Sequence, residues 1–177
     1  MPTQEIQVAL SLPPFIKLSG KWVVQKAEKD AAWELYVELV TRISTVPLDE
    51  DSGLLREALT SLHSIFDTTR GILRRHGRAV ATRQKNSLSF GVLAVTVLNS
   101  GIRPFLAKWH PALEDYEATR EEGVSRMAHE RSWERSQDMR KELAGLREIL
   151  VQYAKILEDA LSLDGDISLL WDGGTTS

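Results

Sequence analysis

Residues 139–160, MRKELAGLREILVQYAKILEDA, carry the most regular pattern in the chain and decide its fold class. Apolar side chains recur there at alternating spacings of four and three residues, at Met139, Leu143, Leu146, Leu150, Tyr153, Leu157 and Ala160. This spacing gives an α-helix one continuous apolar stripe, and partner helices must cover such a stripe. The segment therefore predicts a helical bundle, and the same stripe would also suit a homo-oligomer.

Two earlier segments also repeat apolar residues at helical spacing. A helix is predicted over residues 26–44, where the recurring side chains are Trp33, Tyr36, Val37, Val40 and Ile43. A second is predicted over residues 52–76, where they are Leu55, Leu59, Leu62, Phe66, Thr69 and Leu73. Gly77 follows this segment at the place where a glycine commonly ends a helix.

The segment 88–111, LSFGVLAVTVLNSGIRPFLAKWHP, is apolar around nearly the whole circumference of a helix in its first half. Such a helix belongs at the centre of a bundle, and Pro104 should kink it or start a new helix. Residues 86–102 are also 17 residues without a formal charge. A transmembrane helix needs about 20 predominantly apolar residues, and this stretch contains several serines together with Thr96 and Asn99. A buried central helix explains the same composition.

The N-terminal segment alternates apolar and polar residues, with Ile6, Val8, Leu10 and Leu12 on one side. This period of two suits a strand, which Pro13 and Pro14 should stop. The segment is expected either to lie extended across the bundle or to pair with residues 15–24. The predicted fold is all-α, a bundle of four to five helices with a short extended N-terminal arm. Residues 1–177 form one domain, with the arm at 1–25 and a disordered tail at 172–177.

Catalytic and cofactor motifs are missing from the sequence. The chain contains no cysteine, which excludes disulfides, thiolate nucleophiles and cysteine-based zinc sites. Its four histidines are scattered, and no phosphate-binding loop or nucleophile motif occurs. We therefore expect no metal, no cofactor and no enzymatic activity. The first twenty residues lack the features of a secretory signal, which predicts a cytoplasmic protein.

Charge is distributed unevenly along the chain, whose net charge is −3. Between Thr68 and Leu113 there are eight basic residues and no acidic one, whereas the rest of the chain holds 14 basic and 25 acidic residues. The candidate anion-binding residues are Arg70, Arg74, Arg75, Arg78, Arg83 and Lys85. They could hold phosphates by charge-assisted contacts. Alternatively, they cap the preceding helix and pair with the chain's own acids at Glu34, Glu38, Glu114, Asp115 or Glu121.

A second candidate surface is the run 102–111, IRPFLAKWHP, because tryptophan and arginine are frequent at interface hot spots. The candidate partner-binding residues are Arg103, Lys108, Trp109, His110 and Trp133. Alternatively, Phe105, Leu106 and Trp109 close the end of the bundle at a helix kink.

These features predict a non-enzymatic helical interaction module, an adaptor or regulatory subunit of a larger complex whose partner is another protein. The separated charge fields and the polar segment 117–138 motivate this prediction, since they could orient an encounter. One alternative is nucleic-acid or polyanion binding through residues 70–85. A second alternative is a membrane-active bundle that uses residues 86–102.

Overall fold

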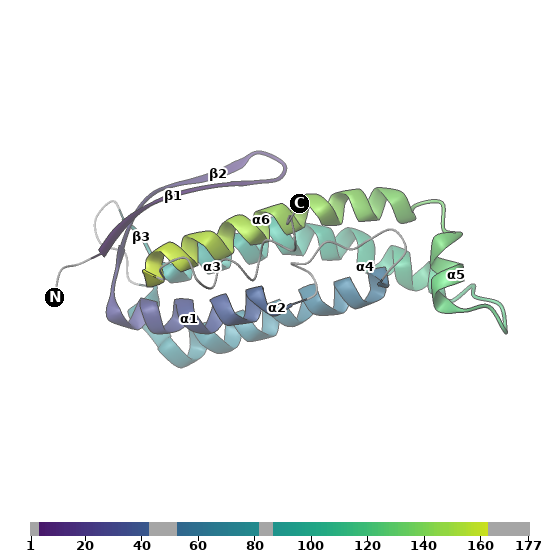
Figure 1. Cartoon of the computed structure of the whole chain (residues 1–177), viewed down its shortest axis with the longest axis horizontal. Coiled ribbons are helices and arrows are strands. Elements are labelled where there is room, and N and C mark those ends of the chain that lie inside the picture. The colour runs from purple at the N-terminus through teal and green to yellow at the C-terminus, as the bar shows by residue number, and fades with distance from the viewer. Residues whose placement is uncertain (1–3, 43–52, 82–86, 163–177) are drawn as a thin grey trace, which may run out of the picture.

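Long helices lying side by side form the body of the protein in the computed structural model, which describes residues 4–42, 53–81 and 87–162 (Figure 1). They are α1 (Lys26–Val40), α2 (Leu55–His76), α6 (Ser136–Leu161) and a continuous helix made of α3 (Phe90–Thr96), the π-helical turn η3 (Val97–Ile102) and α4 (Arg103–Glu117). A short 3₁₀ turn, η2 (Gly77–Val80), follows α2, and the short helix α5 (Arg126–Arg131) lies beside the end of α4. The tail predicted at 172–177 lies outside the described residues.

The apolar stripes predicted within residues 52–76 and 139–160 meet the central helix in one core. The stripe predicted for the first helix is wrong, because Trp33 and Val37 are 46% and 37% exposed and α1 buries Tyr36 together with Ala31, Ala32, Leu35 and Leu39 instead. Leu93 of the central helix is fully buried, and Leu146 of α6 is 4% exposed. The largest fully buried side chains come from nearly every element: Trp22, Tyr36, Phe90, Trp109 and Tyr153. Gly77 ends α2 as predicted, with a positive φ of 60° and its backbone N–H donating to the carbonyl of Leu73. The mostly helical character of the chain is therefore confirmed, but the predicted buried face of the first helix is not.

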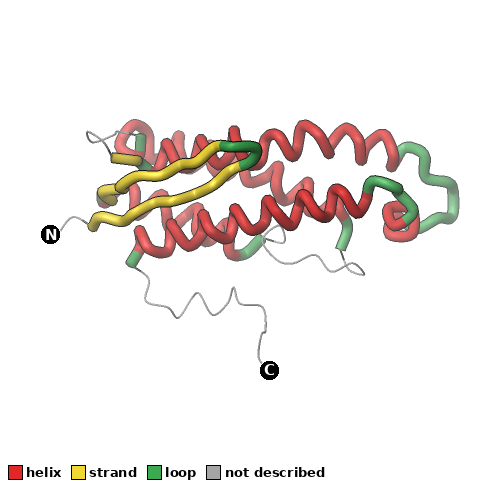
Figure 2. Tube along the Cα trace, turned by 90° about the horizontal axis from the view of Figure 1, so that it is seen from above, coloured by secondary structure: helices red, strands yellow, loops and turns green. Residues whose placement is uncertain are grey.

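The predicted all-α class is wrong, because the N-terminal residues form a sheet. β1 (Gln4–Leu12) and β2 (Ile16–Val24) pair as an antiparallel hairpin, in register from Gln4 opposite Val24 to Leu12 opposite Ile16. The two-residue strand β3 (Ser87–Leu88) adds to β2 in parallel, which makes a three-stranded mixed sheet. Figure 2 shows the hairpin as a layer lying over the helices. The fold is a mostly helical arrangement of helices and a small sheet.

The hairpin forms because each strand has one apolar side and the bundle offers a surface for it. Val8, Leu10 and Leu12 of β1 are buried, and β1 packs on α6 and η3. Trp22 and Val24 of β2 are buried as well. Of the two arrangements considered for the alternating segment, pairing with the following residues is the one found. Pro13 and Pro14 stop β1 as expected, but they do so in the turn of a hairpin.

A buried glutamate fixes the corner where the hairpin enters the bundle. Glu28 is 2% exposed and belongs to the first turn of α1. Its carboxylate accepts a hydrogen bond from the backbone N–H of Gln25 at 2.9 Å and one from the backbone N–H of Phe90, also at 2.9 Å. Because these amides lie at the starts of α1 and α3, one side chain satisfies otherwise unpaired groups of two helices.

The central helix continues through both of its prolines. Pro104 directly follows the π-helical turn η3, in the first turn of α4, and Pro111 lies inside α4. The whole helix, Phe90–Glu117, has 28 residues and a mean hydropathy of 1.4 over its most apolar window, which is long and apolar enough to cross a membrane. Core helices of soluble proteins meet the same criteria, and 56% of this window is buried inside the bundle.

Candidate anion-binding groove between α2 and α4

α2 and α4 run antiparallel and face each other with a shared spacing of seven residues. Arg56, near the start of α2, pairs with Glu117 at the end of α4. Further along α2, Phe66 lies against Arg103 at the start of α4, so the two helices run in opposite directions. The side chains that recur on the two facing sides are Arg56, His63 and Arg70 on α2, and Glu117, His110 and Arg103 on α4. Seven residues are two helical turns, so each set lies on one face of its helix.

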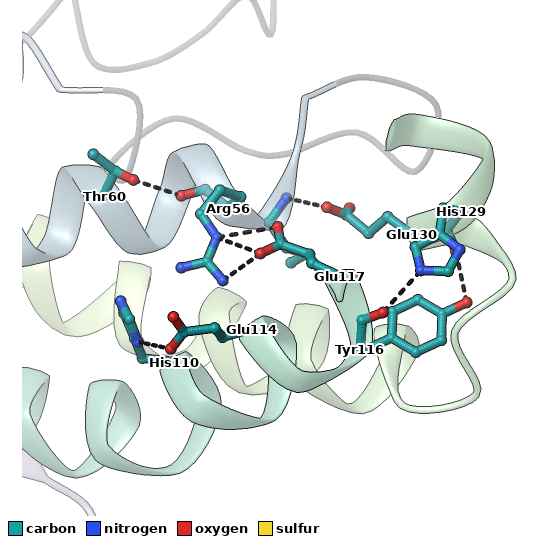
Figure 3. Close-up of polar contacts among 9 residues, drawn as sticks. Arg56, Thr60, His110, Glu114, Tyr116, Glu117, His129 and Glu130 are labelled. Carbon is teal, nitrogen blue, oxygen red and sulfur yellow. Dashed lines mark hydrogen bonds and ion pairs between the residues drawn. The ribbon is translucent and has the colours of Figure 1, made fainter. Parts of the chain in front are cut away.

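One end of this seam is neutral. The guanidinium of Arg56 donates from Nε to both carboxylate oxygens of Glu117, at 3.1 and 3.0 Å, and from Nη2 to Oε2 at 2.6 Å. Figure 3 shows the two side chains pointing toward each other from the two helices. A forked arginine–carboxylate pair of this kind leaves neither charge available to a ligand.

The other end of the seam carries two arginines with the same charge. The guanidinium carbons of Arg70 and Arg103 lie 5.4 and 5.6 Å from the centroid of one ring, that of Phe66. Each arginine is therefore in range of a cation–π contact with that ring. His63 and His110 complete the polar lining of a shallow groove of about 440 Å³.

Acidic residues stand beside this groove but do not line it. Asp67 Oδ1 lies 3.8 Å from Arg70 Nη1, and Glu114 Oε2 lies 3.7 Å from His110 Nδ1. Both separations exceed hydrogen-bond length, and both carboxylates are largely exposed, so they neutralise the groove weakly. The remaining lining is apolar: Phe66, Leu106, Ala107 and Pro111.

The arrangement suits an anion with several oxygen atoms. Arginine presents paired donors that match phosphate and carboxylate groups, and two guanidinium groups lining one groove give it a positive potential that attracts an anion. Imidazole groups can add further donors. The groove can therefore bind a phosphate or carboxylate group.

The predicted anion-binding residues do not act as one cluster. Arg75 and His76 both contact the carboxylate of Glu34 on α1, and His76 Nε2 lies 2.8 Å from Glu34 Oε1. The hydrogen bond from the Arg75 guanidinium holds the pKa of Glu34 below its usual value. Glu34 is one of the internal partners that the sequence suggested. The structural explanation therefore holds for Arg75.

The other members of the predicted set are spread over a wider region. Arg74 near the end of α2 and Arg78 in η2 are exposed, and neither lines the groove. Arg83 and Lys85 fall in 82–86, outside the part of the chain that the structure describes. Among the described members of this set, Arg70 alone lines the groove, together with Arg103 and His110 from the second predicted set.

Two members of the predicted partner surface belong to the core. Trp109 is 1% exposed and Trp133 is 6% exposed, and their rings meet edge to face with centroids 6.0 Å apart. Trp109 Nε1 donates to Glu142 at 2.8 Å, and Lys108 forms an ion pair with the same carboxylate. Burial alone would raise the pKa of Glu142, but these two donors bring it below its usual value. Trp109 thus closes the bundle, as the structural alternative proposed.

A second cavity of about 370 Å³ lies at the neutral end of the seam. Its wall includes Tyr116 and His129, whose rings stack with centroids 4.2 Å apart. His129 Nε2 lies 2.9 Å from the backbone carbonyl of Tyr116 (Figure 3). Glu130, also in the wall, is 6% exposed, and burial raises its pKa. Its two oxygens accept hydrogen bonds from the backbone N–H of Leu55 and from the guanidinium of Arg140, so this carboxylate stabilises the fold.

Sequence reasoning missed His63 and Phe66 as members of the site. The signal that could have found them is the spacing of seven residues from Arg56 through His63 to Arg70, matched by the same spacing from Arg103 to Glu117. Within 4–42, 53–81 and 87–162, no group of three or more histidine, aspartate or glutamate side chains could hold a metal ion. Comparison with protein-family models, curated protein sequences and solved structures finds no match to this chain.

Proposed function

We propose that this protein is a non-enzymatic interaction module that binds an anionic group of a partner protein in the groove between α2 and α4. One observation carries the proposal: Arg70 and Arg103, from two different helices, lie against the same Phe66 ring in a groove whose lining contains no acid among the described residues. Two positive charges that line one groove raise the local potential, and a bound anion lowers it.

The short length of the basic surface favours a single phosphate or carboxylate group over a nucleic acid. The Arg56–Glu117 ion pair lies two helical turns from His63 and His110 and neutralises the charge at that end of the seam. The ring of Phe66 is 7% exposed and covered by arginines, so it offers no open face on which a base could stack. Phosphorylated serine or threonine in an extended peptide presents an anion of suitable size.

The test is binding of a phosphoserine- and phosphothreonine-containing peptide library to the full chain, compared with the same library without phosphate. Inorganic phosphate serves as a minimal probe, followed by amide chemical shifts in NMR spectra. Arg70→Gln and Arg103→Gln should each weaken binding on the order of tenfold or more, since a hydrogen bond to a charged group contributes about 1.5–3 kcal/mol. Arg74→Gln, four residues beyond Arg70 on the same helix, is the matched control and should bind normally.

Several outcomes would reject the proposal. One is the absence of phosphate-dependent binding, and another is binding that survives both groove substitutions. A salt-sensitive affinity for generic DNA or RNA that falls with Arg74→Glu and Arg75→Glu would favour the polyanion alternative. Association with lipid vesicles that the groove substitutions leave unchanged would favour the membrane alternative.

A further inference from the structure

The tip of the β-hairpin exposes a large apolar side chain. Phe15 is 95% exposed and Ile16 is 41% exposed. Both follow Pro13 and Pro14, which are exposed as well. Leaving a phenylalanine in water forgoes the favourable burial of its ring, and large exposed apolar patches mark interaction sites.

An apolar hollow lies directly beside this tip. Its volume is about 450 Å³, and Pro13 and Pro14 form one wall of it. Figure 1 shows that the hairpin runs along α6 and stops partway along it. The hollow at this tip is lined by the hairpin and by residues of η3, α4 and α6. The other walls include Gly101 and Pro104 on one side and Gly145 on α6 on the other.

We infer that the hollow receives the Phe15 side chain of a second copy of this chain, in a two-fold symmetric dimer. The knob and the hollow adjoin each other on one face of the molecule. A two-fold axis near the tip therefore places each Phe15 in the partner's hollow, and a self-complementary patch of this kind is what an isologous dimer requires. The Phe15 ring would then pack against the proline wall and the exposed backbone of Gly145.

Charge at the rim favours a second copy over a neutral partner. Lys17, two residues beyond Phe15, is exposed and has no ion-pair partner among the described residues. Glu148, three residues beyond Gly145 on α6, is also exposed and also lacks one within those ranges. Bringing one copy's tip to the other copy's hollow brings Lys17 toward the side of α6 that carries Glu148. Opposite charges at a rim orient association and make it sensitive to salt.

Sedimentation velocity of the full chain over a wide range of concentration tests the inference. The expected result is a reversible dimer. Phe15→Asp should weaken the dimer about a hundredfold or more, because two buried phenylalanines are lost from each dimer. Gly145→Gln should fill the hollow and weaken the dimer to a similar extent. A Cβ at residue 145 meets nothing within 4 Å, so thermal unfolding of this variant should show an intact fold.

Met127→Asp, at another partly exposed apolar position, is the control and should leave the dimer intact. Because the chain lacks cysteine, an equal mixture of Phe15→Cys and Gly145→Cys proteins should also form a mixed disulfide under mild oxidation. A monomer at every concentration would overturn the inference, as would a dimer that both Phe15→Asp and Gly145→Gln leave unchanged. Binding of a monomeric chain to neutral lipid vesicles through Phe15 would assign the tip to a membrane and equally overturn it.

Discussion

Glu130 accepts a hydrogen bond from the backbone N–H of Leu55 at 2.9 Å, across 75 residues of sequence. Leu55 is the first residue of α2, and the residue before it, Leu54, has no polar side chain with which to cap the helix. Glu130 therefore caps α2 from a distant segment of the chain, whereas a serine or aspartate immediately before a helix usually provides the cap. Its other oxygen binds Arg140 at 3.0 Å, so the cap also ties α5 to α6.

Removing this carboxylate should destabilise the protein strongly. Glu130→Ala leaves the Leu55 N–H without an acceptor and the guanidinium of Arg140 with a poorer set of partners, and we expect a loss of about 2–4 kcal/mol in the free energy of unfolding. Glu130→Gln keeps an acceptor oxygen and should lose less than half as much. Urea denaturation measures both. Equal losses for the two variants would show that the charge, and not the cap, stabilises this corner.

Two helical glycines should respond in opposite directions to alanine. A Cβ on Gly91 would lie 3.0 Å from the carbonyl oxygen of Val80 and 3.2 Å from Cα of Ala81, both backbone atoms, so Gly91→Ala should cost about 1–3 kcal/mol. A Cβ on Gly145 meets nothing within 4 Å, so Gly145→Ala should add about 0.5–1 kcal/mol through helix propensity alone. Thermal unfolding of the two variants checks the pair, and a stabilised Gly91→Ala would contradict the packing described here.

Glu34 should make stability depend on pH in the acid range. The hydrogen bond from Arg75 lowers the pKa of Glu34 in the folded protein, so the folded state releases this proton more readily than the unfolded state. The stabilisation from Glu34 is therefore present above about pH 4.5 and is lost as pH falls through the lowered value. Glu34→Gln should flatten that part of the acid unfolding profile measured with urea. If the free energy of unfolding falls equally steeply with pH in the wild type and in Glu34→Gln, Glu34 makes no such contribution.

The two histidines of the groove should contribute to anion binding. His63 and His110 line the groove with Arg70 and Arg103, and an imidazole N–H can donate a hydrogen bond to an anion. Sulfate is a suitable probe, and calorimetry measures its affinity. That affinity should be lower for a His63→Leu, His110→Leu variant than for the wild type. Equal affinities for the two proteins would exclude the two imidazoles.

The helices could be predicted from sequence because each buries its own periodic stripe. The pattern of residues 139–160 has one geometric solution, and α6 realises it. The sheet could not be predicted with the same security, since β2 contains Lys17, Gly20 and Lys21 and alternates poorly. Its pairing depends on β1 and on the helical surface beneath, neither of which a local pattern reveals. A two-residue strand such as β3 leaves no periodic signal at all.

The groove could be anticipated only in part. Arg70, Arg103 and His110 were singled out as candidates, but in two separate sets, because the antiparallel packing that unites them is a tertiary property. Conversely, Arg75 looked available in the sequence and is bound to Glu34 in the structure. A run of like charge along a chain does not say which members share a face with acids from another helix.

The matched spacing of α2 and α4 also constrains how this chain can change over evolution. Each inserted or deleted residue rotates everything that follows on a helix by about 100°. A single such event between Phe66 and Arg70 would turn one guanidinium away from Phe66 while leaving the Arg56–Glu117 pair in place. Substitutions can retune the site gradually, whereas length changes within these two helices would abolish it in one step.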